Sequence, residues 1–298
     1  MGDREKEAAF NRARSAQLRR GIAIQRDTAA EVRRLLNQAQ ADIAAALKDA
    51  PSDFQLFRLT ELQKSVRQAL AKFEPGAGAA LHGGLDLSWQ AGQALIDAPV
   101  AAAAGVDLAG HLVAIDTRRL MAMRDFVTHR IKDITVSLAD RINGELGATA
   151  IGTQTPYQAA EKIAGILDTG GMKRANTIVR TQLGAAFSSA AQSRQEQAKE
   201  VLPGLKKQWR RSGKIHSRYS HHAIDGQIRD VDKPFDLEGG VKLMFPRDPA
   251  GPVGEIINCG CTSIPYMASW DVIQPGRKPF SDEELAASRM KRNLDGAF

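Results

Sequence analysis

The chain has 298 residues, which is enough to bury a substantial core and to form two domains. Lysine and arginine together outnumber aspartate and glutamate by 41 to 34, and aromatic residues make up 5% of the chain. Abundant alanine with so few aromatic residues argues against a β-rich fold and favours long helices. The modest positive charge suits an acidic partner such as nucleic acid, and it equally suits an ordinary solvated surface.

The cysteine count and the hydropathy exclude two further classes of protein. Only two cysteines occur, and one residue separates them, so they cannot form a disulfide framework and would be strained as a bridge. Residues 2–7 are mostly charged, so we expect no secretory signal after Met1. The most apolar run, residues 94–104, falls short of the about 20 residues that a membrane span needs. We therefore expect a reduced, cytosolic chain with no membrane partner.

Apolar residues recur at helical spacing through most of the first 203 residues. The predicted helices span residues 4–48, 52–73, 85–97, 108–146, 156–170 and 173–199. The first twenty residues are charged and weakly periodic, which suits either an extended arm or a solvated helix end, and the helix end is the expectation. Thr155, Pro156 and Gln158 predict a capping box with proline at the first helical position.

Glycine and proline place the predicted breaks between these helices. Residues 74–84 contain Pro75 and four glycines, which predicts a loop or hinge. Pro99 is expected to end the next helix, and residues 144–153 are expected to form another break. Two glycines at 170–171 are expected to end the helix that begins at Pro156.

After Gly204 the pattern changes to short segments separated by turns. Strands are predicted over 205–211, around Val241–Phe245 and over 262–267, with helical turns over 217–223. The fold class is therefore α+β, mainly α. We predict a helical region over 1–203, a small α+β module over 204–268, and a tail over 269–298 with a helix from 280 to 294.

The chemically able side chains concentrate between Trp209 and Cys261. Cys259 and Cys261 place two soft ligands on one turn, and a tetrahedral zinc would take two more. The candidates for the remaining ligands are His221, His222 and His216, with Asp225 as a weaker one. The alternative is two buried thiols that pack beside a histidine bonded to the backbone, with no metal.

Two other functions are open for the same stretch. A hydrolase would use His221 or His222 as general base or metal ligand, with Asp225 and Asn258 orienting the substrate, or a cysteine as nucleophile. A basic cluster predicts contact with nucleic-acid phosphates or with a protein partner; it comprises Lys206, Lys207, Arg210, Arg211 and Lys214. Trp209 suits either base stacking or the core of the module, and the core is the expectation.

Taken together, these residues resemble the phage Mu F-like head morphogenesis family, the minor capsid proteins of tailed phages and prophages. The resemblance covers residues 142–266 and rests on Arg180-Thr181-Gln182, Trp209, Arg218-Tyr219-Ser220-His221, Ile224-Asp225-Gly226, Pro246-Arg247-Asp248-Pro249 and Asn258-Cys259-Gly260-Cys261. This chain has Gln182 where the family has an acid and Gly260 where it has an arginine. If those two residues pair in the family, this chain has lost both partners.

The resemblance implies a minor capsid protein without enzymatic activity, located in the virion, inside the head and near the portal. Such a protein would be assembled in the host cytoplasm and would assist head assembly, DNA packaging or ejection. Its implied partners are the portal protein, major capsid or scaffold proteins, and packaged DNA. A metal-dependent hydrolase or a toxin-like nuclease module is the alternative. Trp209, Arg218, Asp225, Gly226 and Asn258 are expected to set the fold of the module.

Overall fold

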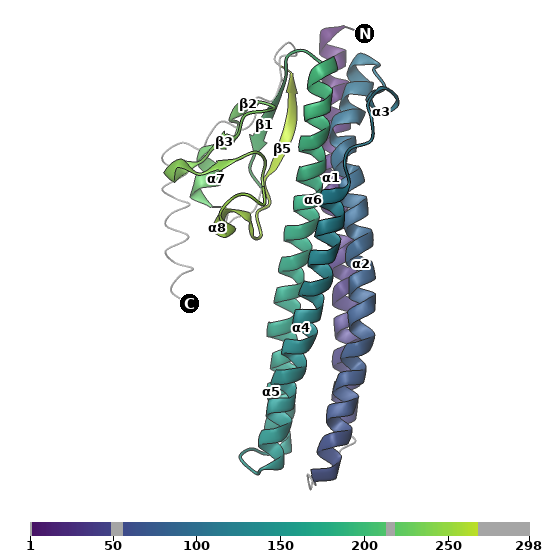
Figure 1. Cartoon of the computed structure of the whole chain (residues 1–298), viewed down its shortest axis with the longest axis vertical. Coiled ribbons are helices and arrows are strands. Elements are labelled where there is room, and N and C mark those ends of the chain that lie inside the picture. Colours follow the sequence, from purple (N-terminus) through teal and green to yellow (C-terminus); the bar gives the residue numbers. More distant parts are fainter. Residues whose placement is uncertain (1, 49–55, 213–217, 268–298) are drawn as a thin grey trace. The chain divides into compact units, whose positions relative to one another are not determined.

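The computed structural model describes residues 2–48, 56–212 and 218–267 (Figure 1). It is mainly α-helical with a small β-containing region near the C-terminus, which confirms the predicted α+β class. The chain divides into two compact units. The first unit comprises Met1–Gln25, Leu85–Leu120 and Arg180–Phe298, and the second comprises Arg26–Gly84 and Met121–Val179.

Long helices make up most of the described chain. They are α1 (Asp3–Lys48), α2 (Leu56–Ala104), α3 (Leu108–His111), α4 (Arg118–Ala150), α5 (Pro156–Gly165) and α6 (Lys173–Val201), with the π-helical segment η1 (Ile166–Met172) joining α5 to α6. The predicted capping box is confirmed, because the Thr155 side chain accepts from the Gln158 backbone while the Gln158 side chain accepts from the Thr155 backbone. None of the helices in the described residues is long and apolar enough to cross a membrane.

The second unit is built on apolar stripes of helical period. On α4 the buried residues recur every three or four positions: Met123, Val127, Ile131, Ile134, Leu138, Ile142, Leu146 and Thr149. Segments from α1 and α2 supply similar stripes, which include Val32, Leu36, Ile43, Val66, Leu70 and Phe73. The Cα of Gly171 in η1 lies so close to Leu36 and Leu138 that an added Cβ would be 3.1–3.2 Å from them.

Two predicted breaks do not occur, and the one predicted over 144–153 is confined to residues 151–155, after α4 ends at Ala150. Residues 74–84 and Pro99 lie within α2, whose apolar stripe continues through the buried Ala77, Leu81 and Leu85. Gly144 and Gly147 lie within α4 on either side of the buried Leu146. A glycine costs a helix only about 1 kcal/mol, whereas burying one leucine side chain returns about 1.5–3 kcal/mol.

Two helix ends also differ from the predictions. The helix predicted over 108–146 is divided into α3 and α4, and residues 112–117 between them are not helical. The end predicted at Gly170-Gly171 does not occur, because η1 carries the backbone through both glycines into α6.

The helices of the first unit approach each other closely. Gly92 of α2 faces Phe187 and Ala190 of α6, and a Cβ added at Gly92 would overlap the Phe187 carbonyl oxygen. The small residues of α6 thus allow tight helix packing, as the sequence predicted. One buried cluster joins these helices to residues near the C-terminal end of the described chain: Phe10, Ala91, Leu95, Ile96, Val100, Ala103, Leu108, Phe187, Ala191, Ala198, Leu205, Val231 and Met267.

Within the first unit, residues 205–267 form a small region that we call the C-terminal module. Its three-stranded antiparallel sheet has the order β2-β1-β5, with β1 (Leu205–Arg210) between β2 (Ile228–Asp230) and β5 (Thr262–Met267). A two-stranded sheet, β3 (Phe235–Asp236) and β4 (Lys242–Leu243), lies beyond it. Short helices complete the module: α7 (Tyr219–Ala223), the 3₁₀ turn η2 (Glu238–Gly240) and α8 (Val253–Ile256).

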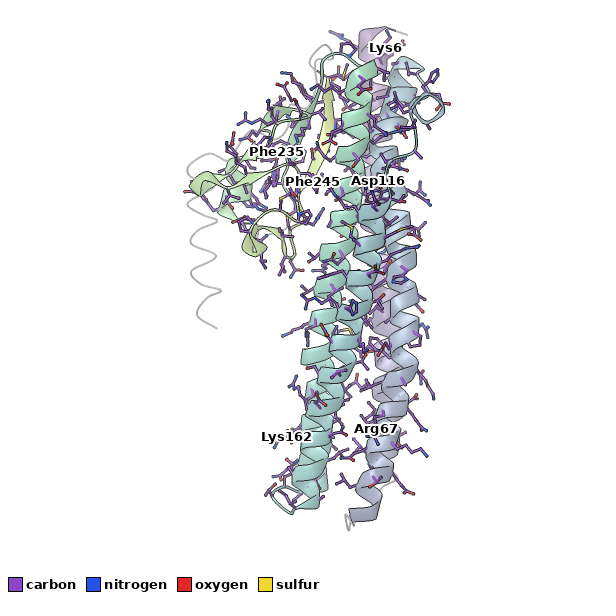
Figure 2. The ribbon with its side chains drawn as sticks, viewed as in Figure 1. Lys6, Arg67, Asp116, Lys162, Phe235 and Phe245 are labelled. Carbon is purple, nitrogen blue, oxygen red and sulfur yellow. The ribbon has the colours of Figure 1, made fainter. Side chains whose placement is uncertain are left out.

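The predicted strands over 205–211 and 262–267 correspond to β1 and β5, while the strand predicted around Val241–Phe245 shrinks to the two residues of β4. Phe235 and Phe245 both lie inside the module (Figure 2) and are buried. The predicted tail after 268, its helix over 280–294 and the start of the helix predicted over 52–73 fall outside the described residues, as do Lys214 and His216.

Candidate metal centre

Three potential metal ligands meet in the interior of the C-terminal module. The His221 Nδ1 atom lies 3.4 Å from the Cys259 Sγ atom and 3.5 Å from the Cys261 Sγ atom. All three ligand atoms lie within 4.8 Å of one another, and all three residues are buried. His221 comes from α7, and the cysteines precede β5, so the cluster joins segments that are 38 and 40 residues apart in sequence.

The opposite nitrogen of the His221 ring has an acidic partner. His221 Nε2 lies 2.7 Å from Glu255 Oε2, and the Ser220 hydroxyl donates to the same oxygen at 3.1 Å. A carboxylate this close to Nε2 favours the tautomer that carries its ring proton on Nε2. In this tautomer the lone pair of Nδ1 faces the two sulfur atoms. A histidine that binds a metal through Nδ1 needs this tautomer.

The two thiols shift each other's pKa in opposite directions. The hydrogen bond from Cys261 lowers the pKa of the Cys259 thiol well below its ordinary value, and His221 and the positive charge of Arg247 lower it further. The same hydrogen bond, together with burial, raises the pKa of Cys261. The backbone N–H of Cys261 also donates to Cys259 Sγ at 3.4 Å. Of the two cysteines, Cys259 is thus the one whose deprotonated form these contacts favour.

The Arg247 side chain stabilises the Cys-Gly-Cys turn. Its guanidinium donates to the carbonyl oxygens of Cys259 (2.5 Å) and Cys261 (3.0 Å), and it reaches Ser188 Oγ of α6 at 3.5 Å. Burial lowers the pKa of Arg247, while negative charge on the two cysteines opposes that shift. Gly184 of α6 makes room, because a Cβ there would lie 2.5 Å from Arg247 Cζ.

The loop that carries Arg247 has a demanding backbone. Arg247 has a φ of 67°, a left-handed conformation that costs a residue with a side chain about 1–2 kcal/mol. Asp248 stabilises this turn, since its carboxylate accepts from the backbone N–H groups of Met244 and Ala250. The Pro-Arg-Asp-Pro segment thereby places the guanidinium of Arg247 against the cysteine turn. The residue between the two cysteines is Gly260, which has no side chain to do this.

The residue before the cysteines is fixed from two sides. The backbone N–H of Asn258 donates to the Thr181 hydroxyl of α6 at 3.1 Å, and Arg218 donates to the Ile257 carbonyl at 2.6 Å. Asn258 has a φ of 55°, which asparagine tolerates better than most residues. Helix α6 therefore contributes Thr181, Gly184 and Ser188 to the support of the site.

Trp209 and Asp225 are two further buried residues of the module near the site. The Trp209 ring is fully buried and meets the rings of His221 and Phe235 edge to face, with centroids 5.3 and 5.2 Å apart. Asp225 is buried beneath Arg210 and Arg211, and its carboxylate accepts from the Arg211 N–H at 3.0 Å. Gly226 has a φ of 87° and donates to the Trp209 carbonyl, which explains why glycine follows the aspartate. Trp209 is therefore the core anchor that the sequence predicted.

The structure separates the predicted ligands into two groups. Among the described residues, His221, Cys259 and Cys261 form the ligand cluster, whereas His222 is buried in α7 outside it. Asp225 is engaged by the two arginines instead.

The predicted basic cluster is not one open surface. Lys207 requires a correction: it is fully buried, and its ammonium donates to Gln192 Oε1 and the Met244 carbonyl. A strand alternates its side chains between two faces, so adjacent basic residues cannot all face one partner. Lys206 pairs with Asp230 on the exposed side, and Arg210 and Arg211 pair with Asp225. Contact of these three with nucleic acid stays a prediction.

Two residues of the site were missed in the sequence. Arg247 belongs to a recognisable motif, but nothing in its spacing shows that its side chain turns inward. Glu255 lies in a proline- and glycine-rich loop where an acidic residue is usually solvated. The only available signal was their place between the strand near Leu243 and the cysteines.

Comparison with known proteins gives partial likenesses only. No family model matches the chain, and no solved structure matches it. The NAD(+)–arginine ADP-ribosyltransferase EFV of Enterococcus faecalis is 37% identical over 115 residues, which is 38% of this chain and 23% of that protein. The uncharacterized protein YqbB of Bacillus subtilis is 37% identical over 116 residues, 38% of this chain and 36% of that protein. The matched segment thus spans between about a quarter and a third of these relatives.

Proposed function

We propose that this chain is a minor capsid protein of a tailed phage or prophage. In this proposal it lies inside the head near the portal and assists head assembly, DNA packaging or ejection. The portal protein and major capsid or scaffold proteins are its proposed partners, with packaged DNA as a further one. The chain would assemble into the particle in the host cytoplasm.

The observation that carries the proposal is that the motifs of the Mu F-like pattern interlock. Thr181 binds the backbone of Asn258, Arg218 binds that of Ile257, and Arg247 binds those of both cysteines. Motifs that match by chance would have no reason to contact one another across about 80 residues of sequence. Their direct contacts support a resemblance that extends to the module's fold.

The alternative of a metal-dependent hydrolase or toxin-like nuclease is less well supported by the same geometry. A general base needs a nitrogen that can reach a substrate. Both nitrogens of His221 are engaged, one by Glu255 and one by the thiols, and His221 is 1% exposed. The ADP-ribosyltransferase activity in the name of the Enterococcus relative belongs to a protein of which the alignment covers 23%, so we do not propose it for this chain.

The proposal is tested by the location of the chain. Particles from a host that produces this protein should be purified, treated with nuclease and protease, and analysed by mass spectrometry. We expect the chain to be protected inside the heads and to cross-link to the portal protein. A chain that is absent from purified heads and does not associate with portal protein would overturn the proposal.

A parallel assay addresses the alternative. The purified chain should be incubated with DNA and divalent metal ions, beside His221→Gln and the matched control His222→Gln. We expect no cleavage by any of the three. Metal-dependent cleavage that is lost only in His221→Gln would favour the nuclease instead.

A further inference from the structure

We propose that His221, Cys259 and Cys261 bind one zinc ion, and that Glu255 orients the histidine from the outer side. This site does not depend on the proposed role in the capsid. Its basis is the spacing of the three ligand atoms, the tautomer of the histidine and the charges that surround the sulfur atoms.

The spacing fits a tetrahedral zinc ion. Zinc lies about 2.3 Å from cysteine sulfur and about 2.0 Å from histidine nitrogen, so tetrahedral geometry separates the two ligand atoms by about 3.5 Å. The observed distances from His221 Nδ1 are 3.4 and 3.5 Å. The single lone pair on Nδ1 can accept a hydrogen bond from only one thiol. One ion bound by all three ligand atoms explains why both sulfur atoms lie at nearly the same distance from Nδ1.

The outer contacts are those of a metal-bound histidine. Such histidines donate their second ring N–H to a carboxylate or a carbonyl, which fixes the ring and makes the ligand nitrogen more basic. Glu255 occupies that position at 2.7 Å, and Ser220 holds the carboxylate at 3.1 Å. Glu255 lies in α8, so one ion and its outer contacts would connect α7, α8 and the turn before β5.

The donor set selects the metal. Two thiolates and an imidazole suit zinc, and they do not suit magnesium or calcium, which prefer oxygen ligands. Zinc binds cysteine as the thiolate, so binding would release the thiol protons and leave two thiolates on the ion. Arg247 behind the turn and the backbone N–H of Cys261 favour that negative charge.

The site also gives the module a cross-link that its core lacks. The apolar cluster beneath it is small: Trp209, Ile224, Phe235, Leu237, Leu243, Cys259 and Cys261. Five of the module's elements have only two to four residues each. Modules with so little regular structure are commonly stabilised by a metal.

The experiment measures metal in the whole purified chain. We expect one zinc per chain by elemental analysis after gel filtration against a weak chelator. Replacing zinc by Co²⁺ should give a sulfur-to-cobalt charge-transfer band and the visible bands of a tetrahedral ion. X-ray absorption should show two sulfur atoms at about 2.3 Å and the remaining ligands at about 2.0 Å. Failure of the wild-type chain to bind equimolar Zn²⁺ or Co²⁺ would overturn the proposal without any variant.

Four variants and one matched control locate the site. Cys259→Ser, Cys261→Ser and His221→Gln should each lose the equimolar metal, whereas the matched control His222→Gln, from the same short helix, should keep it. Glu255→Gln should retain the metal with affinity weakened by about 10- to 100-fold. Metal retained in all three ligand variants, or lost equally in His222→Gln, would contradict the assignment.

A structural readout guards against variants that do not fold. In the wild-type chain, adding Zn²⁺ after chelation should slow hydrogen exchange in residues 218–223 and 253–262. Exchange in the second unit should not change. Zinc that binds without slowing exchange in these two segments would place the ion elsewhere.

Discussion

The C-terminal module and the second unit are stabilised in different ways. In the second unit, many similar apolar residues lie in stripes along long helices, so each contact has several equivalents. In the module, single residues hold segments that are distant in sequence, as Arg247 does for the cysteine turn and Trp209 for His221. Because these residues have no equivalents, one substitution should disturb the module far more than one substitution disturbs the helices.

The strongest way to test this contrast is Arg247→Met. The variant leaves the carbonyls of Cys259 and Cys261 without their buried donor and removes a positive charge that lowers the pKa of Cys259. Loss of one partner from a buried charged network costs about 3–5 kcal/mol. Denaturant unfolding should show this loss, and hydrogen exchange should accelerate in residues 205–267 but not in the second unit.

The control for this variant is Arg118→Met, which removes an exposed pair with Asp116 and should leave stability unchanged. Equal losses in the two variants, or exchange that accelerates throughout the second unit, would contradict the contrast.

A second test compares two glycines within helices. Gly92→Ala would press a methyl group onto the Phe187 carbonyl and should lower the free energy of unfolding by about 1–3 kcal/mol. Gly144→Ala meets no atom within 4 Å, so it should raise stability by up to about 1 kcal/mol through helix propensity. Thermal unfolding of both variants measures the difference. If the two alanines shift the midpoint in the same direction, the close helix approach at Gly92 is wrong.

These glycines also show where prediction from sequence succeeded and failed. Periodicity identified the buried stripe of α4 and the length of α6, because an apolar face repeats every 3.6 residues whatever it packs against. The glycines at 76, 92 and 144 give the same local signal in the sequence, but their surroundings differ. A Cβ added at Gly76 would meet the Leu35 side chain, one at Gly92 would meet the backbone of α6, and one at Gly144 would meet no atom within 4 Å. Only tertiary packing distinguishes a glycine that breaks a helix from one that admits a neighbour.

For the site, the sequence predicted the residue types but only part of the arrangement. The Cys-x-Cys spacing and the nearby histidines suggested a shared cluster, and the structure brings His221 together with both cysteines. Whether His221 or its neighbour His222 joins the cysteines depends on which side of α7 faces them. Two adjacent histidines in a sequence do not show this. The inward turn of Arg247 depends on its left-handed backbone and on the space above Gly184, both of which are tertiary features.

The third test uses pH. Burial lowers the pKa of Lys207 from 10.5 to about 8. Between these two values the unfolded chain binds more protons than the folded chain, so the contribution of Lys207 to stability rises with pH. The cost of its buried charge is fully present below pH 8. Relative to Lys207→Met, the wild-type chain should gain about 1–2 kcal/mol as pH rises from 8 to 10.

The exposed neighbour Lys206 provides the matched comparison for this pH series. Lys206→Met should follow the wild-type pH dependence closely, because this variant leaves the Lys207 ammonium buried. A Lys207→Met chain whose stability runs parallel to that of wild type from pH 8 to 10 would show that Lys207 is not buried as a cation.

The smallest effect is expected at the helix cap of α5, where the second unit depends on a local hydrogen bond rather than on its buried apolar stripes. Thr155→Ala removes the hydroxyl that accepts from the Gln158 N–H at 3.2 Å, and the loss of such a helix cap costs about 1 kcal/mol. Thr155→Ser keeps the acceptor and should restore most of the urea midpoint. Gln158→Ala removes the reciprocal acceptor for the Thr155 N–H, so the two alanine substitutions should cost less together than the sum of their separate effects. Strict additivity, or a serine variant as unstable as the alanine variant, would mean that the stripes alone hold the start of α5.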